Sequence, residues 1–409
     1  MKILIVNKFY DLRGGTERVM FDLRDGLAAR GHELIPFSMQ DERNEASEWS
    51  RFFVPSRDYD APGLGTKLRQ ARLTIYDSQA RRCLENLLDE LRPDLAHLHN
   101  IYHQLSPSIL QPLRRRGIPV VMTLHDFKLA CPSYTLFRDG KPCQKCVKLK
   151  LPFWCAVHCC SRGSRAESII LSIESSVHRM QRVYEQGVDR FICPSRTMAE
   201  VMRKRGIPAA KLTVIPNAPR EIGQAANWSE RSEEPSVLCA GRLSREKGVD
   251  VLVEAARKTP GIRIRIAGDG PLAESLRERA RGLPWVQFLG RLSSEELRSE
   301  RARAWLCAVP SICTENAPLT VLESYASGRG ALVSDRGGLK ELVDETTGSR
   351  IEAGNPEAWH AALAAMVQQE EIWEARGKAA RRRLERDYSF EQVLSAHESL
   401  FEELSGGSA

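Results

Sequence analysis

The sequence predicts an α/β protein made of two doubly wound domains, each built on a parallel sheet. Three observations support this fold class. The chain has 409 residues, which is too long for one ordinary hydrophobic core. A buried strand, a glycine-containing turn and an amphipathic helix follow one another at residues 2–30 and again at residues 236–258. Residues 219–235 between these halves are polar and aperiodic, which is typical of an interdomain linker.

The first half begins with a continuous apolar run at residues 2–9, which predicts a strand buried on both faces. A helix is predicted over residues 16–30, because apolar side chains recur there at helical spacing until Gly31 ends the pattern. Further strands of this half are predicted at residues 94–99, 119–125, 190–194 and 212–216.

The second half repeats this order with a strand at residues 236–243 and a helix at residues 249–258. Its further strands are predicted at residues 263–267, 286–289, 305–310 and 330–334. We therefore expect an N-terminal domain of residues 1–218 and a C-terminal domain of residues 236–387. Ligands of such sheets bind beyond the carboxyl ends of the strands, so a cleft between the domains is the expected site.

The composition is that of a folded globular protein, with 42% hydrophobic and 28% charged residues, and it excludes a mainly disordered or fibrous chain. The net charge of +7 is modest for this length, and we expect no nucleic-acid partner. No apolar run approaches the ~20 residues that span a bilayer. The N-terminus has too few apolar residues for a signal peptide, so we expect a cytoplasmic protein.

One segment is strongly basic. Residues 111–165 carry eleven Lys or Arg against two acids, a local charge of +9, which leaves about −2 for the remaining residues. It contains the apolar stretch LKLPFWCAV (149–157), in which Lys150 lies between two leucines, and Lys148 directly precedes this stretch. Such a loop suits the anionic inner face of a cell membrane, to which the protein would bind peripherally. An ordinary buried loop and a zinc-ribbon nucleic-acid module are the alternatives.

The same segment, residues 128–165 of the expected N-terminal domain, is rich in cysteine. Thiols in the cytoplasm are mostly reduced, so a disulfide framework is not the first explanation. A structural zinc is one hypothesis, while an iron–sulfur cluster and a loop without metal remain open. The candidate zinc ligands are Cys131, Cys143, Cys146, Cys155 and Cys159, with Cys160 following directly.

Two features suit a phosphate ligand. Gly14 and Gly15 lie between the first strand and the first helix, where a ligand can approach the backbone and the helix amino end favours an anion. Arg242 lies at a strand end and Lys247 in the following loop. Two cations so placed can hold a diphosphate without a divalent metal.

Glu315 and Glu323 are eight residues apart on either side of Pro318, a favourable first residue of a helix. Five residues at ~1.5 Å rise separate Pro318 from Glu323 by ~7.5 Å along the helix. The carboxylates would therefore meet different parts of one elongated ligand, such as a sugar and a ribose, whose hydroxyls they can accept. The helix start between them would face the phosphates.

Five motifs in one order now point to a family: GGTE at 14–17, LHD at 124–126, GRLSREKG at 241–248, AGDGPL at 267–272, and the two glutamates with seven residues between them. Together they resemble the family 4 retaining glycosyltransferases. The resemblance implies the GT-B architecture, with two Rossmann-like domains facing each other across a cleft. It also implies that a C-terminal helix, residues 388–404, crosses back onto the first domain.

The resemblance further implies an activity, the retaining transfer of a sugar from a nucleotide diphosphate sugar to an acceptor. The acceptor would be a saccharide or a lipid-linked saccharide, as in polysaccharide or glycolipid synthesis. No cofactor is expected for catalysis, because the two cations stabilise the leaving diphosphate. No residue in the sequence selects the base or the sugar of the donor.

The resemblance also assigns roles to residues. The catalytic set is His125, Arg242, Lys247 and Glu315. The donor site adds Gly14, Gly15, Gly268, Asp269, Leu319, Thr320 and Glu323 to Arg242, Lys247 and Glu315. The acceptor side has Glu17, His99 and Asn100. Two departures from the family pattern are Ala317-Pro318 in place of Phe-Gly and Ala218-Pro219-Arg220 in place of Gly-Val-Asp.

Alternatives remain for several motifs. Gly268-Asp269-Gly270 resembles a dinucleotide fingerprint, which would make the protein a nucleotide-dependent oxidoreductase, although no acid follows at the right strand end. Asp58-Tyr59-Asp60 resembles a metal-binding Asp-x-Asp, and a solvated turn is the other explanation. His97, His99 and His103 suggest either a metal site or strand-end residues that line the cleft. A binding protein for sugar nucleotides without turnover is the non-enzymatic alternative.

Overall fold

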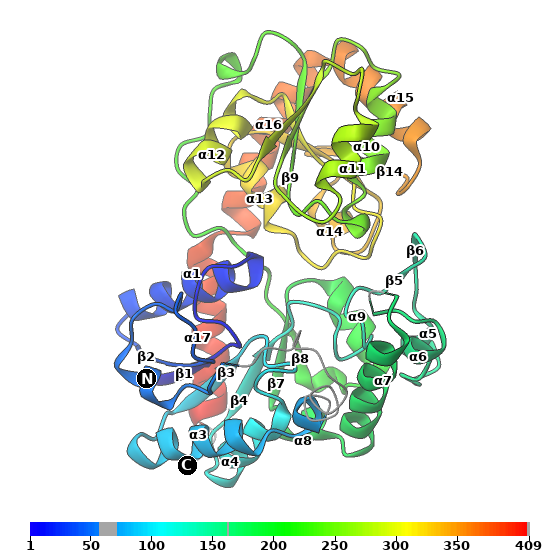
Figure 1. Ribbon diagram of the computed structural model, residues 1–409. Helices are drawn as coiled ribbons and strands as arrows, with labels where there is room; N and C mark the ends of the chain where they lie inside the picture. Colours follow the sequence, from blue (N-terminus) through cyan, green and yellow to red (C-terminus); the bar gives the residue numbers. More distant parts are fainter. Residues whose placement is uncertain (57–71, 162, 407–409) are drawn as a thin grey trace. The chain divides into compact units, whose positions relative to one another are not determined.

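The computed structural model describes residues 1–56, 72–161 and 163–406 (Figure 1). The chain forms two compact units. Unit 1 contains Met1–Tyr134, Gln144–Pro216 and Glu391–Ala409, and unit 2 contains Thr135–Cys143 and Asn217–Phe390. The sequence Asp58-Tyr59-Asp60 lies outside the described residues.

Unit 1 is built on a six-stranded parallel sheet of order β2-β1-β3-β4-β7-β8. Its first strand is buried on both faces, since Ile3, Leu4, Ile5 and Val6 are all in the core. This is the environment that a continuous apolar run predicts. The strands are β1 (Lys2–Val6), β2 (Glu33–Phe37), β3 (Leu95–Leu98), β4 (Val120–Thr123), β7 (Arg190–Cys193) and β8 (Leu212–Val214).

The helices of unit 1 are α1 (Gly15–Ala29), α3 (Ser78–Glu90), α4 (Leu110–Arg115), α5 (Lys145–Lys148), α6 (Trp154–Val157), α7 (Arg165–Met180), α8 (Val183–Gly187), α9 (Arg196–Arg205) and α17 (Phe390–Gly406). Although α17 is C-terminal, it packs into this unit (red in Figure 1). The rings of His397 and Phe401 lie 5.8 and 5.3 Å from the ring of His97 on β3. Arg30 at the end of α1 also pairs with Glu391 and Glu398.

Unit 2 is built on a second six-stranded parallel sheet, of order β11-β10-β9-β12-β13-β14. Its strands are β9 (Ser236–Ala240), β10 (Arg263–Ala267), β11 (Val286–Gly290), β12 (Leu306–Val309), β13 (Gly330–Ser334) and β14 (Gly348–Ile351). Its helices are α10 (Val249–Ala256), α11 (Ala273–Arg279), α12 (Ser294–Arg303), α13 (Leu319–Ala326), α14 (Leu339–Leu342), α15 (Pro356–Gln368) and α16 (Glu370–Asp387). The two units thus repeat one architecture.

Five short 3-10 turns complete the described structure, at Glu48–Phe52, Pro107–Ile109, Ala209–Lys211, Trp228–Glu230 and Arg245–Lys247. An antiparallel hairpin, β5 (Phe137–Arg138) with β6 (Lys141–Pro142), lies within the segment that we expected in the N-terminal domain. The structure instead groups this hairpin with unit 2. The physical reason is that Phe137 packs against the apolar core of unit 2.

Two strands of the structure, β2 and β14, are absent from the elements that the sequence predicts. Both lie at the edge of their sheet. β2 contains Pro36, which an edge strand tolerates because one side of it needs no hydrogen-bonded neighbour. β14 reads Gly-Ser-Arg-Ile and offers a single large apolar residue. β14 therefore lacks the hydrophobic run that marks the central strands, and in β2 the apolar run is short and interrupted by Pro36.

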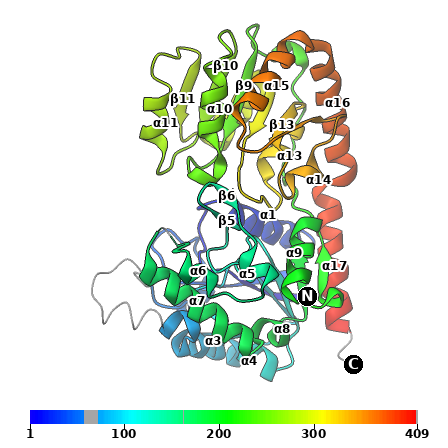
Figure 2. The same cartoon turned by 90° about the vertical axis from the view of Figure 1, so that its right-hand side faces the viewer.

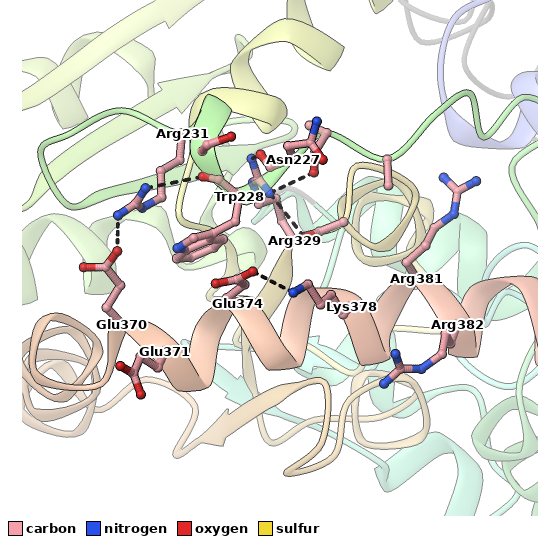
Figure 3. A pocket seen from close by; sticks show the side chains of 14 residues that line it. Asn227, Trp228, Arg231, Arg329, Glu370, Glu371, Glu374, Lys378, Arg381 and Arg382 are labelled. Atoms are coloured by element: carbon pink, nitrogen blue, oxygen red, sulfur yellow. Dashed lines mark hydrogen bonds and ion pairs between the residues drawn. The ribbon is translucent and has the colours of Figure 1, made fainter.

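The polar segment between the halves is fixed to unit 2 by arginines (Figure 3). The buried guanidinium of Arg329 donates to the carbonyl oxygens of Ala226 and Asn227, at 3.3 and 2.9 Å. Arg231 stacks on Trp228 and pairs with Glu370 of α16. A cavity of about 650 Å³ lies between this segment and α16, and none of the sequence-predicted site residues lines it. Among the described residues, no helix combines the length and apolar character needed to cross a bilayer.

Candidate functional site

The loops after β9 and β10 lie against each other in unit 2. A Cβ atom on Gly268 would lie 1.9 Å from the carbonyl oxygen of Gly241, so only glycine permits this approach. The Leu243 N–H donates to the carbonyl oxygen of Asp269 at 2.9 Å, which joins the two motifs. Arg242 and Asp269 are exposed on these loops. The motifs GRL and AGDGPL thus form one surface at the carboxyl ends of neighbouring strands.

Lys247 and Glu315, which the sequence places 68 residues apart, meet in unit 2. The Lys247 Nζ atom lies 2.7 Å from Glu315 Oε1, and the Ser311 hydroxyl donates to the same oxygen at 2.5 Å. Burial alone would raise the pKa of Glu315, but the Lys247 ammonium and the Ser311 hydroxyl lower it below its usual value. Burial lowers the pKa of Lys247, but Glu315, Cys313 and Glu246 together raise it above its usual value. Both groups are therefore charged at neutral pH.

The loop before α14 supports the backbone of Glu315. The Gly338 N–H donates to the Glu315 carbonyl oxygen at 2.8 Å. Gly337 has a φ of 49°, and a Cβ there would lie 2.3 Å from the same oxygen. Position 337 therefore requires glycine both for its conformation and for its close contact.

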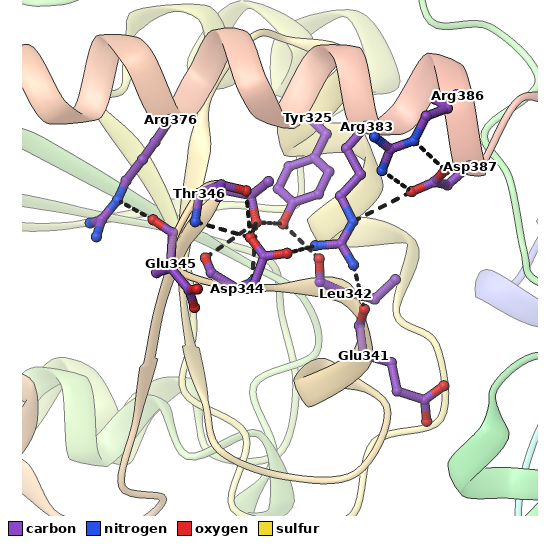
Figure 4. Close-up of polar contacts among 11 residues, drawn as sticks. Tyr325, Glu341, Leu342, Asp344, Glu345, Thr346, Arg376, Arg383, Arg386 and Asp387 are labelled. Carbon is purple, nitrogen blue, oxygen red and sulfur yellow. Dashed lines mark hydrogen bonds and ion pairs between the residues drawn. The ribbon is translucent and has the colours of Figure 1, made fainter.

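The segment from α14 to β14 is itself tied to α13 and α16 (Figure 4). The Tyr325 hydroxyl of α13 donates to the Leu342 carbonyl oxygen at 2.9 Å. Arg383 of α16 donates to Asp344 Oδ2 at 2.7 Å and to the Glu341 carbonyl oxygen at 2.8 Å. These contacts fix the segment that follows Gly337 and Gly338, the two glycines that contact the Glu315 backbone.

Helix α13 carries Glu323. It begins at Leu319 with Pro318 as its N-cap, one residue later than the sequence predicts, and Leu319 and Thr320 occupy the first turn. The Glu323 carboxylate is paired through Oε2 with Arg301, a buried residue of α12. Arg301 was not among the predicted site residues, because α12 is a run of mixed charges in which no spacing distinguishes it.

Two of the predicted residues of unit 1, Glu17 and Asn100, are linked by Asn7. Gly14 is the N-cap of α1 and Gly15 its first residue. Asn7 donates to Glu17 Oε1 at 3.3 Å and accepts the Asn100 N–H at 3.0 Å. Asn7 follows β1 directly, and this position at a strand end is the signal that could have identified it.

His125 follows β4 and lies against His99, which follows β3. His125 Nε2 lies 2.8 Å from His99 Nδ1. His97 Nε2 forms a hydrogen bond of 2.8 Å with the Thr123 hydroxyl. His99 is fully buried, whereas His125 is partly exposed. Burial lowers the pKa of His125 to about 4 and that of His99 well below its usual value, so both imidazoles are neutral at pH 7. His99 thus contacts His125 inside unit 1, and His125 is the histidine of this pair that reaches the surface.

Among the described residues, no cysteine of the basic segment forms a disulfide. A hydrogen bond from the Cys160 thiol to Cys155 lowers the pKa of Cys155. Cys143 belongs to unit 2, while Cys131, Cys146 and Cys159 belong to unit 1. Among the described residues, no group of three or more His, Cys, Asp or Glu side chains is arranged to hold a metal ion, so the zinc site stays a prediction.

Known structures share this fold over nearly the whole chain. Sucrose-phosphate synthase from Thermosynechococcus elongatus matches with a TM-score of 0.73 and 20% identity, covering 100% of both chains. Anabaena HepE in complex with UDP and glucose matches with a TM-score of 0.69 and 14% identity, covering 98% of this chain and 100% of that chain. With two parallel-sheet units of this topology, the protein has the GT-B fold of glycosyltransferases, which confirms the predicted fold class.

Family comparisons agree with this class. The model described as Glycosyltransferase Family 4 matches residues 13–218, half of the chain, and the model described as Glycosyl transferases group 1 matches residues 224–383. The chain belongs to glycosyltransferase family 4, as the motifs predict. A curated relative, glycogen synthase of Mycobacterium tuberculosis, is 26% identical over 97% of this chain and 93% of its own. Sulfoquinovosyl transferase SQD2 of Arabidopsis thaliana is 25% identical over 70% of this chain and 53% of its own. The oxidoreductase alternative is therefore set aside.

Proposed function

We propose that the protein is a retaining glycosyltransferase that moves a sugar from a nucleotide diphosphate sugar to a saccharide or lipid-linked saccharide. The observation that carries this proposal is the cluster of Lys247, Glu315 and Ser311 in unit 2. It combines a cation suited to a diphosphate with a carboxylate suited to sugar hydroxyls. The solved complex of HepE with UDP and glucose shows that the fold accommodates such ligands.

The reaction places negative charge on a leaving nucleoside diphosphate and positive charge on the sugar ring. Arg242, Lys247 and the first turn of α13 would stabilise the diphosphate, and each such contact is worth roughly 3 kcal/mol of barrier. Glu323 would accept the ribose hydroxyls and Glu315 the sugar hydroxyls. His125 enters as a neutral imidazole, so it offers a hydrogen bond without adding charge beside the sugar. No divalent ion is needed in this scheme.

The donor is tested first, because the candidate nucleotides are few and the candidate acceptors are many. A thermal-shift panel of ADP, GDP, UDP and their sugars identifies the base, since a bound ligand raises the melting temperature. Release of nucleoside diphosphate from the matched donor then measures turnover, and NMR of the product reports the anomeric configuration. Lys247→Met should reduce turnover by about 100-fold while the protein stays folded. Unchanged turnover, or an inverted product, would contradict the proposal.

The acceptor class and location depend on a surface of unit 1 formed by α5, α6 and α7, which lie side by side (Figure 2). We call this the α5–α7 surface. Its large apolar side chains are 42–58% exposed: Leu149, Leu151, Phe153, Val157, Ile169 and Ile173. Lys145, Lys148 and Lys150 are exposed among them. Apolar side chains beside lysines complement an anionic bilayer, so we infer peripheral binding at the inner membrane face, where lipid-linked acceptors would be reached.

Vesicle binding tests this surface. The protein should pellet with phosphatidylglycerol vesicles at low salt and less at high salt, and should not pellet with phosphatidylcholine vesicles. Phe153→Ser with Ile173→Ser should weaken pelleting by about 10-fold or more. Val367→Ser with Ile372→Ser is the matched control, because these residues of unit 2 are similarly exposed, at 42% and 44%. Full activity on a water-soluble sugar without vesicle binding, or RNA binding by the same surface, would contradict the inference.

A further inference from the structure

Arg301 of α12 is a buried cation whose role the family motifs do not mention. Its side chain is 7% exposed and pairs with Oε2 of Glu323, whose side chain is 26% exposed. The Nε atom of Arg301 has no hydrogen-bond partner within the described part of the chain. The guanidinium therefore serves Glu323 and satisfies no other described carboxylate.

The end of α12 that carries Arg301 is rigidly held. Buried Arg329 donates to the carbonyl oxygens of Ala302 and Ala304, at 2.6 and 2.9 Å. The Arg303 carbonyl oxygen accepts the Ser232 N–H at 2.8 Å. Three consecutive positions after Arg301 are thus fixed by neighbours outside the helix. A side chain that starts from such a backbone has little freedom to follow a moving partner.

The contact uses one oxygen of the Glu323 carboxylate. Arg301 binds Oε2, and no described side chain donates to Oε1. A carboxylate held in this way keeps its second oxygen available to accept hydrogen bonds from hydroxyl groups. The rotamer freedom that a ligand would otherwise have to remove is already lost in the free protein.

We propose that Arg301 is a positioning residue for donor recognition: it aims the Glu323 carboxylate at the ribose hydroxyls of the nucleotide. This inference rests on the proposed function, which assigns the ribose to Glu323. Arg301 itself does not touch the ligand. Its removal should therefore affect the part of the binding energy that comes from the ribose hydroxyls and leave the rest.

Calorimetric titration with a nucleoside diphosphate and its 2′-deoxy and 3′-deoxy analogues separates these parts, with the base chosen by the thermal-shift panel. The unaltered protein should bind the ribonucleotide at least about 10-fold more tightly than the deoxy analogues. In Arg301→Met this ratio should fall to about 1–3. Arg301→Lys keeps the charge but not the planar fork, so its ratio should be intermediate. It also keeps the test usable if the methionine variant does not fold.

Arg298→Met is the matched control, because Arg298 lies on the same helix, is exposed and faces Glu221 at 3.8 Å. It should keep the full ratio. The inference is overturned if folded Arg301 variants keep the ratio, or if Arg298→Met lowers it equally. Another outcome would contradict the role of Glu323 itself, and not only the role of Arg301. If the unaltered protein shows no preference for ribose and Glu323→Gln changes nothing, the assignment of Glu323 to the ribose fails as well.

Discussion

Replacing Glu315 by glutamine should have opposite effects on nucleotide binding and on turnover. In the free protein, the Lys247 ammonium lies 2.7 Å from Glu315 Oε1, so its charge is already compensated. A diphosphate that approaches Lys247 gains from the ammonium but is repelled by the neighbouring carboxylate. Glu315→Gln keeps the shape of the side chain and removes that repulsion.

The size of the effect follows from the geometry. Two like charges ~6 Å apart interact by about 3 kcal/mol at an effective dielectric constant of ~20. Lys247 is 34% exposed and Glu315 is 11% exposed, so solvent reaches one side of the pair. Screening of this kind reduces the repulsion to about 1 kcal/mol. The nucleoside diphosphate alone should therefore bind about 5-fold more tightly to Glu315→Gln.

Turnover should change in the other direction. A neutral amide is a weaker acceptor for sugar hydroxyls than a carboxylate, and it adds no negative charge beside the cationic sugar of the transition state. We expect the turnover number to fall by about 100-fold. Calorimetry with the nucleoside diphosphate and a product-release assay with its sugar measure the two effects separately.

Glu254→Gln is the control for this experiment. It removes the same charge from an exposed site of α10 that pairs with Arg257, and it should change neither quantity. Weaker or equal binding of the nucleoside diphosphate to Glu315→Gln would refute the reasoning, since Lys247 would then not be shared between the carboxylate and the diphosphate.

Three further predictions follow from the same structure. Gly337→Ala should displace Glu315 and abolish turnover. Gly261 also has a positive φ, 94°, but open space around it, so Gly261→Ala should lower only the stability of the fold. Circular dichroism measures the stability of both variants, and the product-release assay measures their turnover. Acidification should loosen unit 1 before unit 2, as hydrogen exchange would show, because burial lowers the pKa of six histidines in unit 1 and unit 2 contains only His360. Folded pKa values below the ordinary ~6.5 mean that this stability is complete above pH ~6.5 and is lost as the pH falls toward 4, by up to ~1.4 kcal/mol per pH unit for each group. Excess EDTA should leave turnover unchanged, and a loss that Mg²⁺ restores would contradict the metal-free scheme.

The sequence predicted the central strands of both sheets well, because they are buried on both faces and their apolar runs cannot be mistaken for solvated segments. The edge strands β2 and β14 gave a weaker signal, because β2 is interrupted by Pro36 and β14 has a single large apolar residue; they are completed by pairing with β1 and β13. Edge pairing is a property of the sheet and leaves little trace in segments of four or five residues.

In the candidate site, too, some residues could be predicted from the sequence and others could not. Lys247, Glu315 and Glu323 were predictable because they stand in motifs at fixed spacing. Their supports were not, because Ser311 and Arg301 reach them from other elements of unit 2. His99 illustrates the converse: the family resemblance assigned it to the acceptor side, but in the structure it is fully buried and contacts His125.

Both predicted functional glutamates of unit 2 have a cation partner in the free protein, Lys247 for Glu315 and Arg301 for Glu323. A carboxylate that is mostly buried needs such a partner, because desolvation of an unpaired charge is costly. Arg242 differs: it is exposed, and among the described residues no side-chain hydrogen bond or ion pair to its guanidinium is found. A diphosphate therefore gains Coulomb energy at Arg242 without breaking a contact, whereas at Lys247 it must share the ammonium with Glu315. It follows that Arg242 should govern the capture of the nucleotide and its salt dependence, while Lys247 should act mainly once the sugar begins to leave and the diphosphate gains charge.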